Sequence, residues 1–152
     1  MNLSDPFCHS ATLPMPVPAL EAFEFLTDTE MMGQWAFGAW GLKPAGNGVF
    51  VGNSMFEDME VYCRLNASRE LLQVDYEVGE DPASLAPRII SKVIPGEHLG
   101  RGADNCLVSL IAWRSETVSE ERWCLTCASH ETEMYRIRHL IESRRNRGTS
   151  ET

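Results

Sequence analysis

The chain has 152 residues and a formal net charge of −9, with 43% apolar and 23% charged residues, which is ordinary for one globular domain. The acidic balance argues against a nucleic-acid partner, because phosphate contacts need clustered lysine and arginine. Residues 1–13 lack the basic region and apolar run of a signal peptide, and the longest apolar stretch is too short to span a bilayer. We therefore expect a cytoplasmic protein without an integral membrane segment.

The first predicted elements are one strand and two short helices. Alternating apolar residues predict a strand over residues 7–15, and three closely spaced prolines end it because proline cannot donate to a β-ladder. Apolar side chains along one side predict a helix over residues 19–27. Asp28 and Thr29 are suited to cap a second helix over residues 30–35.

Six further strands are predicted in series, separated by turn signals. Gly46-Asn47-Gly48 is typical of a hairpin turn, and residues 79–87 form a longer acidic loop that contains proline. The predicted strands cover residues 37–43, 49–56, 60–67, 71–78, 88–95 and 105–115.

The inward face of each strand is predicted by asking which side chains must meet water. On the strand over residues 88–95, Arg88 and Lys92 are assigned to the solvent face. The last strand is apolar on both faces, so we orient it by placing Arg114 outward. That choice turns a set of four residues inward: Leu107, Ser109, Ile111 and Trp113.

A long amphipathic helix is predicted over residues 119–145. Thr117 and Glu120 have the spacing of a capping box, with Ser119 as a competing N-cap. Steps of four and three residues place one stripe of side chains on a single helix face: Trp123, Cys127, His130, Met134, Ile137 and Ile141. Such a helix must lie against the sheet, so residues 1–145 are expected to form one domain and residues 146–152 a flexible tail.

Two cysteines, Cys124 and Cys127, have the spacing of redox and zinc motifs. A redox pair would sit at a helix N-terminus, whereas these two lie inside the helix. A zinc site would need a second pair of ligands, and Cys124, Cys127 and His130 fan across roughly 120° of helix surface. We expect free thiols, no metal site and no cofactor.

The order of the predicted elements, together with the run Pro-Val-Pro-Ala-Leu-Glu-Ala-Phe-Glu-Phe-Leu-Thr-Asp from Pro16 to Asp28 and the following Trp35, resembles the START-like (SRPBCC) superfamily. Its members include polyketide cyclases and Hsp90-activator-like domains, and the resemblance covers residues 7–142. It implies an α+β helix-grip fold, in which a curved antiparallel sheet of about seven strands wraps around the long C-terminal helix. It also implies a cavity between sheet and helix, but not one activity.

If that cavity exists, its predicted wall is mostly aromatic and aliphatic, as in small-molecule sites. Trp35 is instead expected to be a structural plug behind the short helices, and Glu57 and Asp58 to be solvated at a hairpin mouth. The alternative that the wall residues fill a solid core stays open. The predicted ligand-binding residues are Trp40, Phe50, Phe56, Cys63, Tyr76, Trp113, Met134 and Ile137.

His130 is the one titratable residue on the predicted stripe, and burial would favour its neutral form. A neutral imidazole can accept a proton or orient a ligand, but it can equally be a hydrogen-bonded core histidine. Three functions stay open. The first is binding or transport of a small hydrophobic or aromatic ligand oriented by Tyr76 and His130. The second is a polyketide cyclase, aromatase or dehydratase with His130 as acid or base, and the third is a partner-binding module without ligand.

Overall fold

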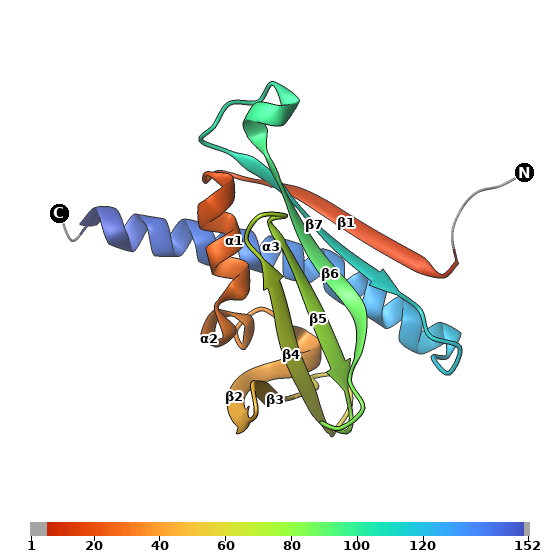
Figure 1. Ribbon diagram of the computed structural model, residues 1–152. Coiled ribbons are helices and arrows are strands. Elements are labelled where there is room, and N and C mark those ends of the chain that lie inside the picture. The colour runs from red at the N-terminus through yellow and green to blue at the C-terminus, as the bar shows by residue number, and fades with distance from the viewer. Residues whose placement is uncertain (1–5, 151–152) are drawn as a thin grey trace, which may run out of the picture.

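One antiparallel sheet of seven strands, in the order β1-β7-β6-β5-β4-β3-β2, is covered on one face by the long helix α3 (Figure 1). The computed structural model describes residues 6–150. The strands are β1 (Cys8–Met15), β2 (Trp40–Gly46), β3 (Val49–Asn53), β4 (Glu60–Ser68), β5 (Gln73–Gly79), β6 (Ala86–Pro95) and β7 (Cys106–Trp113). The helices are α1 (Ala19–Thr27), α2 (Thr29–Met32), the short 3-10 turns η1 (Phe37–Ala39) and η2 (Gly96–Leu99), and α3 (Glu120–Ser150).

The first short helix matches the predicted residues 19–27, whereas α2 starts one residue before the predicted helix over residues 30–35 and ends at Met32. Pro18 is the N-cap of α1, and the Asp28 carboxylate caps α2 by accepting hydrogen bonds from the backbone N–H groups of Glu30 and Met31, at 3.1 and 3.3 Å. α1 packs against β5, β6 and β7 and buries Phe23, Phe25 and Leu26. These helices therefore close one end of the sheet (Figure 1).

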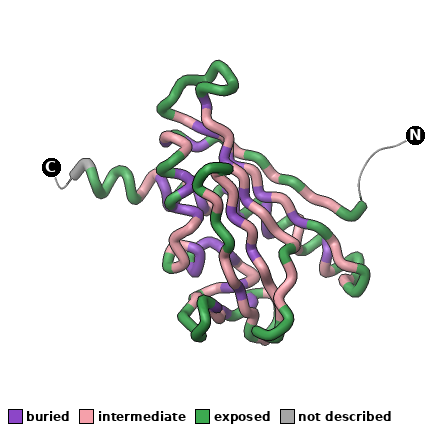
Figure 2. Tube along the Cα trace, in the orientation of Figure 1, coloured by how far each residue is buried: buried purple, intermediate pink, exposed green. Residues whose placement is uncertain are grey.

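The helix α3 lies across the sheet with the predicted stripe inward. Ser119 rather than Thr117 provides the cap, because its Oγ accepts a hydrogen bond from the backbone N–H of Arg122 at 3.1 Å. The stripe residues are buried except Cys127, which is half-buried. The helix continues to Ser150, past the predicted end at Arg145, and residues 144–148 are exposed (Figure 2).

The predicted inward face of β7 is wrong. The buried residues are Cys106, Val108, Leu110 and Ala112, whereas Trp113 is 43% exposed. Arg114 lies beyond the last residue of β7, so its direction does not report the orientation of the strand. The opposite face of β7 is also apolar, because it carries Leu107 and Ile111, which are half-buried. The alternation of apolar and polar residues therefore could not distinguish the inward face of β7 from its outward face.

None of the helices in the part of the chain that the structure describes is long and apolar enough to cross a membrane.

Candidate functional site

A cavity of about 760 Å³ lies between α3 and the sheet. Its wall combines segments far apart in the sequence: the α2–η1 region, the loop between β3 and β4, the inner faces of β4 to β7, and the first half of α3. Buried apolar side chains, including Trp35 and Leu110, form the inner part, and exposed residues such as Glu80 and Thr117 form the rim. A volume of this size accommodates a small molecule.

The structure places four of the predicted site residues on this wall: Phe56, Tyr76, Trp113 and His130. Met134, Ile137 and Cys63 are buried in the hydrophobic core and do not line the cavity. Trp40 and Phe50 are half-buried and also lie away from the wall, where the Trp40 ring stacks on Phe37 with ring centroids 5.9 Å apart.

Trp35, predicted as a plug behind the short helices, lines the cavity. It is 2% exposed and meets the Tyr76 ring edge to face, with centroids 6.1 Å apart and an interplanar angle of 81°. Its indole Nε1 has no hydrogen-bond partner. Because a buried donor without a partner is costly, this N–H is a candidate contact for a bound molecule.

His130 and Glu133, one turn apart on α3, form the polar centre of the wall. Both are buried, and His130 Nε2 lies 4.0 Å from Glu133 Oε2, which is too far for a hydrogen bond. Glu133 Oε1 accepts a hydrogen bond from the backbone N–H of Phe37 at 3.0 Å, whereas His130 Nδ1 has no partner. Each side chain therefore keeps a hydrogen-bonding position that a ligand can use.

Burial shifts the pKa values of His130 and Glu133 in opposite directions. It lowers the pKa of His130 to about 4, with His9 and Arg122 adding smaller repulsions. It raises the pKa of Glu133 to about 8, although the hydrogen bond from Phe37 partly opposes this rise. Near neutral pH the pair therefore consists of an unprotonated imidazole and a protonated carboxyl group, both without charge.

Glu133 was missed by the sequence analysis, which treats His130 as the only titratable residue on the stripe. A charged residue is normally assigned to the solvent face of an amphipathic helix. Glu133 lies three residues after His130 and four before Ile137, and that spacing is the signal that could have placed it inward.

Tyr76 contributes its ring to the wall, but its hydroxyl group is already bound. The hydroxyl lies 3.0 Å from Ser91 Oγ and donates to the Leu26 carbonyl oxygen at 3.4 Å, and all three groups are buried. Burial also raises the Tyr76 pKa. The hydroxyl thus ties β5 to β6 and to α1, and it is less suited to orient a ligand than the sequence analysis expects.

Tyr76→Phe is expected to destabilise the fold by about 1 kcal/mol while leaving ligand affinity unchanged, because it removes a structural hydrogen bond and keeps the ring. Urea unfolding of Tyr76→Phe, Ser91→Ala and the double variant measures the coupling between the two hydroxyls. Strictly additive effects, or a loss of ligand binding in Tyr76→Phe, would contradict this assignment.

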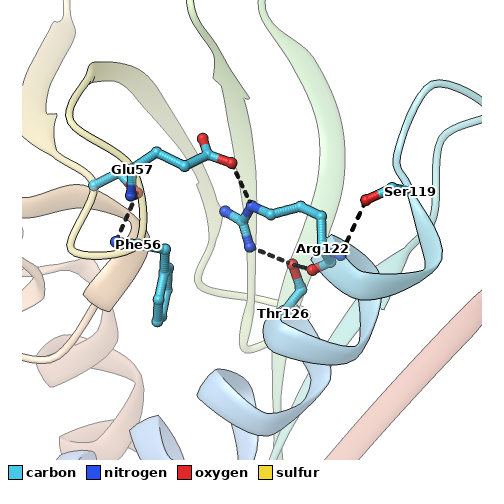
Figure 3. A network of polar contacts seen from close by, with 6 residues as sticks. Phe56, Glu57, Ser119, Arg122 and Thr126 are labelled. Carbon is cyan, nitrogen blue, oxygen red and sulfur yellow. Dashed lines mark hydrogen bonds and ion pairs between the residues drawn. The ribbon is translucent and has the colours of Figure 1, made fainter.

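A network around Arg122 joins α3 to the loop between β3 and β4 at the mouth of the cavity (Figure 3). Arg122 Nε donates to Glu57 Oε1 at 2.9 Å, and Nη1 donates to Thr126 Oγ1 at 2.9 Å. The guanidinium carbon lies 5.3 Å from the centroid of the Phe56 ring. Glu57, expected to be solvated, is therefore ion-paired, and the network holds Phe56 beside the helix.

Arg88, assigned to the solvent face by the sequence analysis, lines the cavity. The reason is an irregularity in the pairing of β5 with β6: Tyr76 pairs with Ile89 and Glu77 pairs with Pro87, so Arg88 has no residue opposite it. Such a β-bulge changes the direction of a side chain relative to simple alternation. The bulge therefore adds a guanidinium group to the wall.

Comparison with solved structures gives the fold class. A START superfamily protein from Mycobacterium smegmatis is 11% identical, with a TM-score of 0.65, and the match covers 90% of this chain and 98% of that chain. The di-domain ARO/CYC StfQ from the steffimycin biosynthetic pathway is 15% identical with a TM-score of 0.66, over 91% of this chain and 46% of that chain. Ara h 8.0201 is 14% identical with a TM-score of 0.58, and the match covers 90% of this chain and 97% of that chain.

The protein has the helix-grip fold of the START-like (SRPBCC) superfamily, which confirms the resemblance and the predicted fold class. No family model and no curated protein matches the sequence. At these identities the likeness concerns the fold, so the function must be argued from the cavity itself.

Proposed function

We propose that this protein binds a small hydrophobic or aromatic molecule in the cavity beneath α3, with the polar end of the molecule held by His130 and Glu133. The observation that carries the proposal is a pair of buried, uncharged side chains with open hydrogen-bonding positions on a largely apolar wall. The fold neighbours, which include a START superfamily protein and an ARO/CYC protein, support the same class of function.

The expected binding energy has two parts. Burial of apolar ligand surface against Trp35, Tyr76 and Leu110 contributes roughly 25 cal/mol per Å². A ligand carbonyl or hydroxyl can accept a hydrogen bond from the protonated Glu133 carboxyl group, and a ligand hydroxyl can donate to the unprotonated nitrogen of His130. The apolar part gives affinity, and the polar pair gives orientation.

A thermal-shift screen against fatty acids, sterols, flavonoids and aromatic polyketides tests the proposal. A ligand that binds the folded cavity raises the unfolding temperature in a saturable way, by several degrees at concentrations well above Kd. His130→Ala is expected to weaken the affinity of any such ligand by about tenfold, since one hydrogen bond to the ligand is lost.

The matched control is His139→Ala, which removes an exposed histidine from the same helix and should leave affinity unchanged. No stabilisation by any compound class, or equal affinities of the His130→Ala variant and the wild type, would contradict the proposed role of the site.

A second candidate function is proton-transfer catalysis of the cyclase, aromatase or dehydratase kind. It is favoured by one observation, the uncharged acid Glu133 beside the uncharged base His130 on a cavity wall. Such a pair can donate and accept protons near neutral pH. If polyketide-like substrates are turned over, His130→Ala should abolish turnover, whereas in a carrier the same change only reduces affinity.

A further inference from the structure

We propose that the cavity selects a ligand that carries a carboxylate, and that Arg88 is the residue that binds it. This inference rests on the proposed function, because it names the chemical class of the molecule that the same cavity would hold. It starts from the bulge in β6, which directs a cationic side chain to the ligand side of the sheet.

Three arginines line the cavity, and two of them already have partners. Arg114 donates to the Val118 carbonyl oxygen at 3.1 and 3.2 Å and pairs with Glu120 at 2.7 Å. Arg122 pairs with Glu57 and Thr126. These contacts fix both guanidinium groups to α3 and its neighbouring loops, so neither is available to a ligand without breaking an existing bond.

Arg88 differs from both of them. Its Nε is shielded from solvent and has no hydrogen-bond partner, and no ion pair joins it to a carboxylate among the described residues. Its strand neighbours Ala86 and Ile89 are apolar wall residues, and Ile89 pairs with Ala112 of β7. A guanidinium group next to such apolar side chains loses hydration, and an unsatisfied N–H there is costly.

A carboxylate is the partner that fits this group best. The guanidinium fork offers parallel N–H donors, which match the two oxygens of a planar carboxylate, and such a charge-assisted pair is stronger than a neutral hydrogen bond. An acid with an apolar body would place its carboxylate at Arg88 and its body against the inner wall.

The acidic residues of the wall do not cancel this preference. Glu57 is neutralised by Arg122, and burial keeps Glu133 protonated near neutral pH. Glu80 and Asp81 lie exposed on the loop between β5 and β6, where water and salt screen their charge. Among the described wall residues, Arg88 is thus the positively charged group that lacks an opposite charge.

The test compares matched acids and primary amides, decanoic acid with decanamide and naphthoic acid with naphthamide, by calorimetric titration at neutral pH. Wild-type protein is expected to bind the acid of a pair about tenfold more tightly than the amide. Arg88→Gln should abolish this preference while leaving amide affinity within about twofold, which also shows that the variant is folded. Arg88→Lys, which keeps the charge but not the fork, should retain part of the preference.

The control is Lys92→Gln, which removes one positive charge from the opposite face of the same strand and should keep the preference for acids. Equal binding of acid and amide to the wild type would overturn the inference and leave the proposed function standing. A preference that survives in Arg88→Gln would overturn the role of Arg88. If neither member of any pair binds, the inference fails, and the thermal-shift screen against sterols, flavonoids and polyketides decides the proposed function separately.

Discussion

Glu133→Gln is expected to make the protein more stable than the wild type in alkaline solution, by on the order of a few kcal/mol near pH 9. The glutamate pKa is raised from 4.5 to about 8 by burial. As the pH rises from 4.5 to about 8, the unfolded chain therefore releases a proton that the folded protein retains, and wild-type stability is lost through this window. Glutamine has no proton to lose, and its side-chain oxygen can still accept the hydrogen bond from Phe37.

Urea unfolding at a series of pH values measures this effect. The free energies of unfolding of the two proteins should converge below about pH 4.5 and separate progressively up to about pH 8. His130, whose pKa is lowered, reduces stability as the pH falls from 6.5 toward 4, but it is present in both proteins. Glu121→Gln, at an exposed position of α3, is the control. Its free energy of unfolding should change with pH in the same way as that of the wild type. A constant difference at all pH values would mean that Glu133 is ionised in the folded state.

Ile137→Ala is expected to lower the free energy of unfolding by about 2–5 kcal/mol without changing ligand affinity. Ile137 is fully buried in the core and lies off the cavity wall, so truncation leaves a void between α3 and the sheet. Denaturant unfolding gives the loss of stability, and titration of the folded variant gives the affinity.

Tyr135→Ala provides the comparison on the same helix, because Tyr135 is 66% exposed. This substitution should lower the free energy of unfolding by no more than about 0.5 kcal/mol. If Ile137→Ala instead kept its stability and lost ligand binding, Ile137 would line the site, as the sequence analysis predicts.

The fold could be predicted from the sequence because its signals are periodic and ordered. The stripe from Trp123 to Ile141 predicts the inward face of α3, and the prolines and Asp28 mark the starts of α1 and α2. These features depend on residues close together in the chain, which is why a single sequence reports them.

The site could be predicted only in part, because its polar groups depend on pairing between distant segments. Arg88 lies on the cavity side of the sheet because it has no residue opposite it in the pairing of β5 with β6. Alternation within β6 alone does not show this. The Tyr76 hydroxyl is bound to Ser91 and to the Leu26 carbonyl oxygen, from two other elements. Glu133 is the exception, since its position relative to His130 and Ile137 is a local signal.

The strand order also determines when the cavity can form during synthesis of the chain. β2 to β7 are sequential neighbours, but β1 pairs only with β7, from Cys8 opposite Trp113 to Met15 opposite Cys106. β1 must therefore wait for β7, the last strand of the sheet in chain order, and α3 follows later still. Contacts between such distant residues form slowly, so the β2–β7 meander is expected to assemble first. β1 would then join its edge beside β7, and α3, which supplies part of the cavity wall, would complete the cavity.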